Sequence, residues 1–520
     1  MNPVFTLKNF RSFGKNGASF ELSPITVLTG CNSAGKSSLV KALTLLCHAP
    51  GEGYSQYHPL ELYKKEIGLG SFDGVINERS TDDRFELSYT IFSNILQERV
   101  MVSRIYGKYR NNLPDSLNDA YLIRCTIKAQ DGTFICEKED QGMGLYHIDI
   151  INVVHRIDDM KINIEYIRPR FENFYLASSY AYSLLKHVDD EAIELFCEIE
   201  KRNIRIEKYD IDLLLGCMRV LSEAREEQRV MGGERQLATF TECFVREVCN
   251  PWFKNNKTDY LGSANNQIKR VYPIEDNSRF GHALRTFHSR QRIHNEWNNK
   301  LEFDDNSLFS PGEFINRWVK KFGIADKIEI KSDGEGSVKV YCVRDKHSRI
   351  LADEGYGITH LLSLLLEIES NITITSETGD PKPYWCKTDS LLTFTFEFSR
   401  EREKRLMCIE EPELHLHPKF QSMLAEMFVE AWQKYNIHFV IETHSEYFIR
   451  KLQVLVADKA CKLSPNDVSI NYVSKDEAGI SSNRQIKIEG NGRLSEPFGE
   501  GFYDEADSLA IELLRFNARK

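Results

Sequence analysis

Apolar and polar positions along the first hundred residues follow the pattern of β-strands, interrupted by one helix. The stretches FTLKNF, SFELS and ITVLTG are typical of strands. Residues 36–47 (KSSLVKALTLLC) instead carry Leu39, Leu43 and Leu46 at helical spacing. Strand-like stretches continue over residues 84–165, in FELSYTIF, MVSRIYGKY, YLIRCTIKA and IDIINVV. We therefore predict an N-terminal lobe, residues 1–170, of antiparallel strands with one helix.

The pattern changes twice in the rest of the chain. Residues 173–250 are rich in Ala, Leu, Glu and Arg at helical spacing, but too short and irregular for a long coiled-coil arm. Residues 254–312 are polar and predict no regular element. Beyond them helices (EFINRWVKKF, GITHLLSLLLEIE) alternate with strands (KIEIK, SVKVYCV, LMCIE, IHFVIET). We predict a mainly helical insertion at 171–312 and a C-terminal lobe at 313–520, with the two α/β lobes folding together.

Composition narrows the class of protein. Apolar residues make up 41% and charged residues 28% of the 520, as in ordinary globular proteins. The net charge of −10 gives no global attraction for nucleic acid, so such contacts would need a local basic patch. The start of the chain lacks the apolar stretch of a signal peptide, and the run LLSLLL is too short to span a membrane. Twelve isolated cysteines without a CxxC pair indicate reduced thiols, so we expect a cytoplasmic protein without membrane contact.

The segment GCNSAGKS, residues 30–37, matches GxxxxGK[ST] between a predicted strand and a predicted helix. Glycines let successive N–H groups turn toward one centre, and the helix N-terminus adds positive potential. A chance glycine turn before a helix is the alternative, but this context favours a phosphate-binding loop. Lys36 is then expected to reach the β- and γ-phosphates of ATP, and the Ser37 hydroxyl to bind Mg²⁺. The residues expected to contact the nucleotide are Gly30, Asn32, Ser33, Ala34, Gly35, Lys36, Ser37 and Ser38.

A second informative segment is LMCIEEPELHLHP, residues 406–418. Four apolar residues predict a buried strand that ends in Glu410 and Glu411. Carboxylates at the C-terminal end of a parallel strand lie in the ligand crevice of an α/β sheet. We expect Glu410 to hold Mg²⁺, directly or through water, and Glu411 to accept a proton from an attacking water. A solvated acidic turn is the alternative. His415 and His417 have no evident third metal ligand, so we interpret them as turn or interface residues.

The third segment is FVIETHSEYFIRKL, residues 439–452. It predicts a strand, then the sequence ETHS, then a helix. The imidazole of His444 in such a position can lie beside the γ-phosphate and the attacking water. The alternative is a helix cap made by Thr443 or Ser445, which is compatible with a catalytic His444.

The order of these three segments resembles the ABC-type ATPase heads of the RecF, SMC and OLD-nuclease lineage. The stretch NFRSFG resembles the opening strand of that group, and residues 67–77 resemble the segment that joins its two lobes. The resemblance implies an α/β fold of the ABC-type ATPase head, in which a mixed sheet with flanking helices is joined to an antiparallel β lobe, here with a helical insertion. It also implies ATP and Mg²⁺ as cofactors.

Residues 353–365, DEGYGITHLLSLL, resemble the signature segment of that group, with Thr359 and His360 in place of the usual Ser-Gln. The resemblance implies that Gly355, Gly357 and Thr359 present a helix start to the γ-phosphate bound by an opposing copy. The expected assembly is therefore an ATP-sandwich dimer of this chain, or a higher oligomer of such dimers.

The end of the chain, PFGEGFYDEADSLAIELL, lacks the acidic cluster of a Toprim nuclease domain. It resembles the C-termini of stand-alone ATPases encoded beside small nucleases in phage-defence operons, of the Septu type (retron-linked members included) or the PARIS type. That resemblance implies a dimeric ATPase sensor that controls a separate nuclease effector in antiphage defence. The alternatives are a RecF-like repair ATPase that binds DNA directly, and a chain that is itself a nuclease.

The densest basic stretch is residues 279–297. Arg285, His288 and Arg292 fall on one helical face, with Phe287 and Trp297 nearby. Such a face can hold a nucleic-acid backbone. Because charge runs usually mark solvated surface, a structural interpretation is favoured over nucleic acid as a partner.

Overall fold

The computed structural model divides the described residues into two compact units. Unit 1 comprises Met1–Leu22, Cys31–Lys257 and Val473–Arg484, and unit 2 comprises Ser23–Gly30, Thr258–Tyr472 and Gln485–Lys520. Most of the predicted helical insertion, residues 172–257, lies outside the described residues. The structure describes residues 2–48, 60, 62, 68–93, 98–108, 120–128, 133–138, 146–151, 153–157, 160–164, 170–171, 258–262, 269–273, 276, 278–298, 312–332, 337–345, 347–372, 384–388, 391–395, 405–499, 509 and 511–515.

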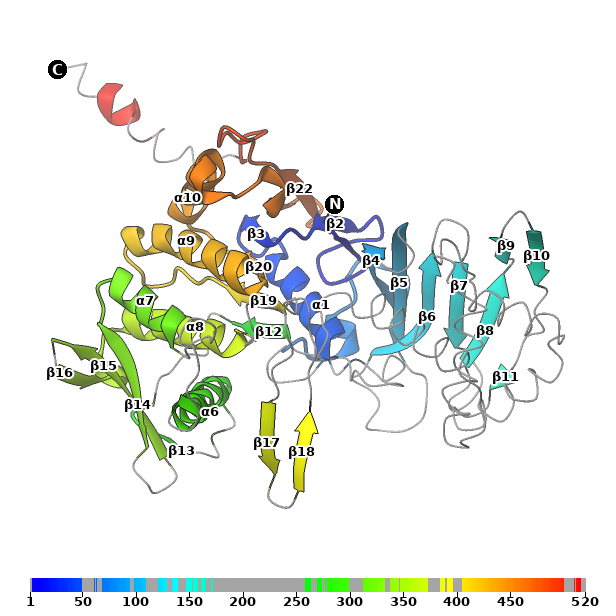
Figure 1. Ribbon diagram of the computed structural model, residues 1–520. Coiled ribbons are helices and arrows are strands. Elements are labelled where there is room, and N and C mark those ends of the chain that lie inside the picture. The colour runs from blue at the N-terminus through cyan, green and yellow to red at the C-terminus, as the bar shows by residue number, and fades with distance from the viewer. Residues whose placement is uncertain are drawn as a thin grey trace. The chain divides into compact units, whose positions relative to one another are not determined.

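Unit 1 contains an antiparallel sheet in the order β11-β8-β7-β6-β5-β4-β1-β2 (Figure 1). Side chains alternate along β1, where Phe5 and Leu7 are fully buried, and Phe85 of β4 stacks on Tyr106 of β5 at 5.3 Å. The antiparallel β-strands expected in this part of the fold are therefore present. Its strands are β1 (Val4–Lys8), β2 (Ala18–Glu21), β4 (Arg84–Ser93), β5 (Glu98–Lys108), β6 (Ala120–Lys128), β7 (Thr133–Lys138), β8 (Tyr146–Ile151) and β11 (Arg170–Phe171).

Two helices and a pair of strands are the other elements described in unit 1, apart from the parts of β21 and β22 that belong to it. Helix α1 (Lys36–His48) follows the GCNSAGKS loop, and a short 3-10 helix, η2 (Phe72–Gly74), lies in the expected lobe-joining segment. The stretch IDIINVV forms parts of two strands, because β9 (Val153–Ile157) pairs with β10 (Met160–Ile164) while β8 pairs with β7.

Unit 2 is built on the sheet that carries the acidic motif. Strands β12, β19, β20 and β3 lie side by side and are all parallel. Every residue of β3 is buried, and so is every residue of β20 except the half-buried His438, as expected for strands covered on both faces. The full order is β12 (Thr258–Leu261), β19 (Arg405–Glu410), β20 (Ile437–Glu442), β3 (Ile25–Gly30), β21 (Val468–Lys475) and β22 (Ser481–Ile486), the last two belonging partly to unit 1.

Helices and a small antiparallel sheet, β13-β15-β14 with β16 beside β15, surround this core. The apolar side chains of α7 recur at helical spacing and bury Phe314, Ile315, Trp318 and Val319. The elements are α6 (Arg279–Asn298), α7 (Glu313–Lys321), α8 (Tyr356–Asn371), α9 (Pro418–Tyr435), α10 (Glu446–Ala457), β13 (Tyr272–Pro273), β14 (Lys327–Ser332), β15 (Ser337–Arg344), β16 (His347–Ile350), the hairpin β17 (Tyr384–Thr388) and β18 (Leu391–Thr395), and the 3-10 helices η5 (Leu351–Asp353), η6 (Lys459–Cys461) and η7 (Pro465–Asp467).

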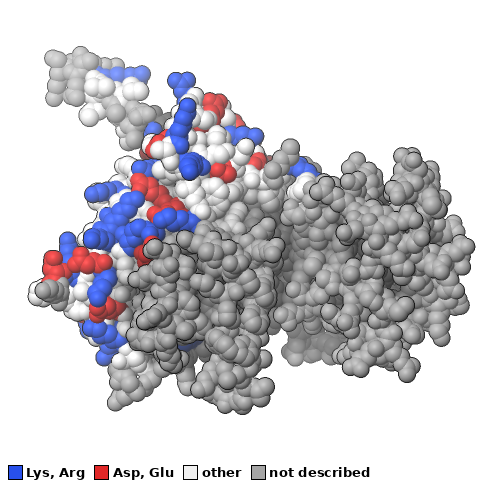
Figure 2. Space-filling view, in the orientation of Figure 1, with Lys and Arg blue, Asp and Glu red and all other residues white. Residues whose placement is uncertain are grey.

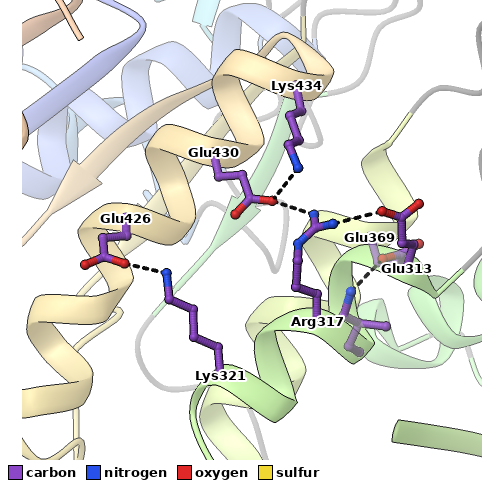
Figure 3. Close-up of polar contacts among 8 residues, drawn as sticks. Glu313, Arg317, Lys321, Glu369, Glu426, Glu430 and Lys434 are labelled. Atoms are coloured by element: carbon purple, nitrogen blue, oxygen red, sulfur yellow. Dashed lines mark hydrogen bonds and ion pairs between the residues drawn. The ribbon is translucent and has the colours of Figure 1, made fainter. Parts of the chain in front are cut away.

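The start of α7 is capped from a distant helix. Its N-cap residue, Gly312, has no side chain to accept a hydrogen bond. The carboxylate of Glu369 on α8 accepts these hydrogen bonds instead. Its Oε1 accepts from Gly312 N at 2.8 Å and its Oε2 from Ile315 N at 3.0 Å. Arg317 and Lys321 of α7 pair with Glu430 and Glu426 of α9 (Figure 3). These contacts fix α7 between α8 and α9.

Replacing Glu369 with alanine is expected to lower the free energy of unfolding by roughly 2–4 kcal/mol, because two buried N–H groups lose their acceptor. Burial raises the pKa of Glu369 to about 7. Between pH 4.5 and about pH 7 the folded chain therefore keeps a proton on Glu369 that the unfolded chain has lost. The contribution of Glu369 to the free energy of unfolding consequently falls as the pH rises through this range, and the variant should not show that fall. Denaturant titration at several pH values measures both effects. The matched control Glu313→Ala, at an exposed i,i+4 pair, should cost less than about 0.5 kcal/mol.

Candidate functional site

The GCNSAGKS loop follows β3 and wraps around its own lysine. Ser33 and Gly35 adopt left-handed backbone, with φ of 58° and 99°. A Cβ on Gly35 would lie 2.4 Å from Ser12 Oγ, so only glycine fits. Lys36 is 4% exposed and donates to Cys31 O at 2.9 Å, while Ala34 O accepts from Ser481 Oγ at 2.6 Å.

The other expected nucleotide contacts lie along the same loop and the first turn of α1. Asn32 and Ser33 are exposed, Ser37 is half-buried, and Ala34 and Ser38 are buried. The curved backbone that a phosphate-binding loop needs is therefore present in unit 1.

Three parallel strands of unit 2 end at a common edge. Glu410, the last residue of β19, pairs in register with Glu442, the last residue of β20. Glu442 lies opposite Leu28 of β3, and β3 ends two residues later at Gly30, where the GCNSAGKS loop begins. The structure thus brings the acidic strand end and the first residue of the loop to one edge of the sheet, as parallel strands require.

A tyrosine that sequence reasoning missed adjoins this edge. Tyr260 lies on β12, in register with Cys408 of β19, and its hydroxyl is hydrogen-bonded to Glu410. Burial, with the negative charges of Glu410 and Glu442, raises the pKa of Tyr260 far above its usual range. The phenol therefore keeps its proton and donates to the carboxylate. The only sequence signal was the short apolar–polar stretch TDYL before Gly262, inside a segment expected to be irregular.

Glu411 begins a tightly turned loop, residues 411–417. Its backbone is left-handed, with φ of 47°, and its N–H donates to Glu442 O at 2.7 Å. His415 is also left-handed, at φ 60°, and His417 caps α9 by accepting from Lys419 N through Nδ1 at 3.3 Å. The two histidines thus act as turn and cap residues. Within the described ranges no group of three metal-ligating side chains occurs.

His444 is exposed between β20 and α10. Its backbone N–H donates to Glu413 Oε1 at 2.7 Å. Ser445 caps α10, because its Oγ accepts from Phe448 N at 3.1 Å. The cap considered from the sequence is therefore made by Ser445, and the imidazole of His444 lies at the surface beside it.

The expected signature segment packs on loop 411–417. Helix α8 starts at Tyr356 after an exposed Gly355, which makes no side-chain cap. His360, whose pKa burial lowers, lies beside the backbone of Pro412 and Glu411. The hydroxyl of Thr359 donates to Tyr356 O at 2.8 Å, so this buried group is used within its own helix. Gly355 and the first turn of α8 form the exposed part of the segment.

Gly357 has no room for a side chain, because a Cβ would lie 2.5 Å from the carbonyl oxygen of His415. Replacing Gly357 with alanine is expected to push the start of α8 off loop 411–417. If the chain hydrolyses ATP between two copies, as its resemblance to ABC-type ATPase heads implies, association and hydrolysis should fall about tenfold while ATP binding persists, since small displacements of reacting groups are costly. Gly490→Ala is the control, because nothing lies within 4 Å of a Cβ there. Light scattering and phosphate release measure the effect, and a fully active Gly357→Ala protein would contradict it.

The basic face predicted on α6 is partly covered, because Arg285 and His288 are half-buried. Phe287 is buried, Arg285 donates to Asp276 O, and Arg290 donates to Ile372 O at 2.9 Å. The side chains of Arg292 and Trp297 lie outside the described residues. On the described part of the surface that Figure 2 shows, Lys and Arg are interspersed with Asp and Glu. These contacts agree with the structural interpretation of the stretch.

Comparison with protein families decides the broad class. A family model described as "AAA ATPase domain" matches residues 4–449, which include the GCNSAGKS loop, Glu410, Glu411 and His444. The chain belongs to this ATPase family. A second model, "Protein of unknown function (DUF3696)", matches residues 463–513 of the ATPase. No curated protein matches this chain.

Solved structures similar to this ATPase include three SMC heads. One, an SMC head bound to the C-winged helix domain of ScpA, is 9% identical with a TM-score of 0.41 and covers 93% of this chain and 98% of its own. The head domain from Thermotoga maritima is 11% identical with a TM-score of 0.36, covering 94% and 100%. A head with an extended coiled coil, bound to the C-terminal domain of ScpA derived from Pyrococcus furiosus, is 11% identical with a TM-score of 0.34, covering 99% and 100%. Among the described helices of this ATPase, none has both the length and the apolar character to cross a membrane.

Proposed function

We propose that this ATPase is of the ABC type and hydrolyses ATP between two copies of the chain. The observation that carries the proposal is the common strand edge, where β19 delivers Glu410 and Glu411 and β3 leads into the GCNSAGKS loop. Carboxylates and the start of a phosphate-binding loop at the C-terminal ends of strands in one parallel sheet are the arrangement that phosphoryl transfer needs.

Each residue has a role in the proposed reaction. Lys36 binds the β- and γ-phosphates, and Gly30, Asn32, Ser33, Ala34, Gly35 and Ser38 shape the loop around them. Glu411 takes the proton from the attacking water, and His444 contacts the γ-phosphate. The oxygen donors Ser37 and Glu410 suit Mg²⁺, which would neutralise charge on the phosphates. Tyr260 supports the Glu410 carboxylate through its hydrogen bond.

The start of α8 supports the dimeric part of the proposal. Gly355 is exposed and the helix lacks a side-chain cap, so its N-terminus can receive an anion from outside. Tyr356 beside it is 55% exposed and contacts His415 edge-on at 4.8 Å. In the proposed dimer, Gly355, Gly357 and the backbone at Thr359 contact the γ-phosphate held by the other copy. ATP binding would then favour the closed dimer, and hydrolysis would release it.

The proposed biological role is a sensor that controls a separate nuclease in antiphage defence. The resemblance of the C-terminal segment to defence ATPases supports this role. A further support is the apolar surface near the C-terminus, where Leu509, Ile511, Leu513 and Leu514 are each at least half exposed. Exposed apolar residues that lie together commonly mark a protein-binding surface.

The test measures the rate of ATP hydrolysis and the molar mass of the protein in solution. Purified protein with ATP and Mg²⁺ should release phosphate at a specific rate that rises with protein concentration, and light scattering should show an ATP-dependent dimer. A specific rate independent of concentration, from a particle that stays monomeric, would contradict the dimeric mechanism. Expression from the native locus should co-purify a nuclease subunit. Salt-sensitive DNA binding by the ATPase alone would favour the RecF-like alternative instead.

A further inference from the structure

We propose that Glu413 is a positioning residue that fixes His444 relative to Glu411. This inference rests on the proposed function, since it assigns a role to a residue that the reaction scheme does not use. Glu413 comes two residues after Glu411, in the loop between β19 and α9. It contacts the segment of His444, which lies about thirty residues further along the chain.

The carboxylate of Glu413 is buried and faces the start of α10. Only 8% of the residue is exposed. Its Oε1 accepts the backbone N–H of His444 at 2.7 Å, and Thr443 lies beside the same side chain, whose Oε2 is buried without a hydrogen-bond partner among the described residues. Burial, aided by the nearby charge of Glu411, raises the pKa of Glu413, and no Lys or Arg is among the described groups that act most on it. A buried carboxylate without a cation and with one unpartnered oxygen is costly, so we infer that its hydrogen bond to His444 N–H serves a specific role.

A second connection runs beside the first. The Oγ of Ser445 donates to Gln421 Oε1 at 2.6 Å, and the amide of Gln421 donates to Leu416 O at 2.9 Å. Loop 411–417 and the segment around His444 are thus joined at two points. On the loop's other side lie Gly357 and His360 of α8. The loop therefore fixes the positions of Glu411, His444 and the start of α8 relative to one another. Glu413 makes the contact with His444 itself.

A purely structural role would be to stabilise the N-terminus of α10, where a negative charge is favourable. Two variants separate this role from positioning. Glu413→Gln keeps the length and an oxygen acceptor for His444 N–H, but removes the charge. Glu413→Asp keeps the charge but is one methylene too short for the 2.7 Å contact. Positioning predicts an active Gln variant and an impaired Asp variant, and a charge effect on α10 predicts the reverse.

The experiment measures steady-state ATP hydrolysis of the full-length variants, with thermal unfolding as the folding check. We expect Glu413→Asp and Glu413→Ala to lower kcat about 10- to 100-fold with KM for ATP within about twofold, and Glu413→Gln to stay within about threefold of wild type. In a His444→Ala background, Glu413→Asp should have almost no further effect, because both changes remove the same contribution.

Several results would overturn the inference while leaving the proposed function intact. All of them presuppose a wild type that hydrolyses ATP. The inference fails if Glu413→Asp is as active as the wild type, or if Glu413→Gln is folded but inactive. It also fails if Glu413→Asp lowers kcat by the same factor in the His444→Ala background as in the wild type. A folded wild type without ATPase activity would instead overturn the proposed function itself. If Glu413→Ala fails to fold, the Gln and Asp pair still decides the question.

Discussion

Replacing Glu411 with glutamine is expected to lower the rate of ATP hydrolysis by about 10²–10⁴-fold while ATP still binds. The amide has the size of the carboxylate, and the left-handed backbone at φ 47°, tied to Glu442 O at 2.7 Å, is set by main-chain contacts that the variant retains. Only the capacity to take a proton from water is lost. Phosphate release under single-turnover conditions measures the rate, and a fluorescent ATP analogue measures binding.

The same variant should accumulate as an ATP-bound dimer, because the step that reopens the dimer is blocked. Light scattering with and without ATP would detect it. Glu446→Gln, a change of the same type on α10 where Glu446 pairs with Arg450, is the control and should hydrolyse ATP normally. Hydrolysis by Glu411→Gln above about a tenth of the wild-type rate would assign the proton acceptor to another group.

Replacing Lys36 with alanine is expected to weaken ATP binding by at least about 100-fold, because the charge at the phosphates is lost. The lysine is 4% exposed and donates to Cys31 O at 2.9 Å, so its ammonium is held inside the loop. Removing it also removes a contact that keeps the loop curved. Calorimetric titration with ATP and Mg²⁺ measures the loss.

The matched control is Lys15→Ala, also in unit 1, at a side chain that is 81% exposed and pairs with Asp82 at 3.5 Å. Its removal subtracts the same charge without touching the loop, and ATP affinity should be unchanged. Equal affinities for the Lys36 variant and the wild type would mean that the nucleotide binds elsewhere.

The segments that carry the motifs could be predicted because each is local. A strand, a loop and a helix follow one another directly around Lys36, and the same is true around Glu411 and His444. Hydrophobic spacing and glycine positions within such a window are enough to place those elements. The resemblance added the order of the segments, which no single window contains.

The elements that could not be predicted depend on partners distant in the sequence. Strand β12 is four residues long and is stable because it pairs with β19, almost 150 residues later. Tyr260 therefore gave no recognisable signal. The cap of α7 by Glu369 is equally non-local, since Gly312 and Glu369 are 57 residues apart in the sequence. Both β12 and α6 fall within the expected insertion, yet they belong to unit 2.

The placement of β3 constrains how the protein can be made. This strand ends at Gly30 and pairs with β20, which begins at Ile437. The ribosome therefore synthesises β20 long after β3 has emerged from it. At cellular rates of translation the delay is on the order of half a minute. During that time six consecutive buried residues, ITVLTG, have no sheet to join. We therefore expect the phosphate-binding region to mature only after β20 has been synthesised, and chaperones to matter more for its yield than for that of the N-terminal β lobe, whose described strands are closer in sequence.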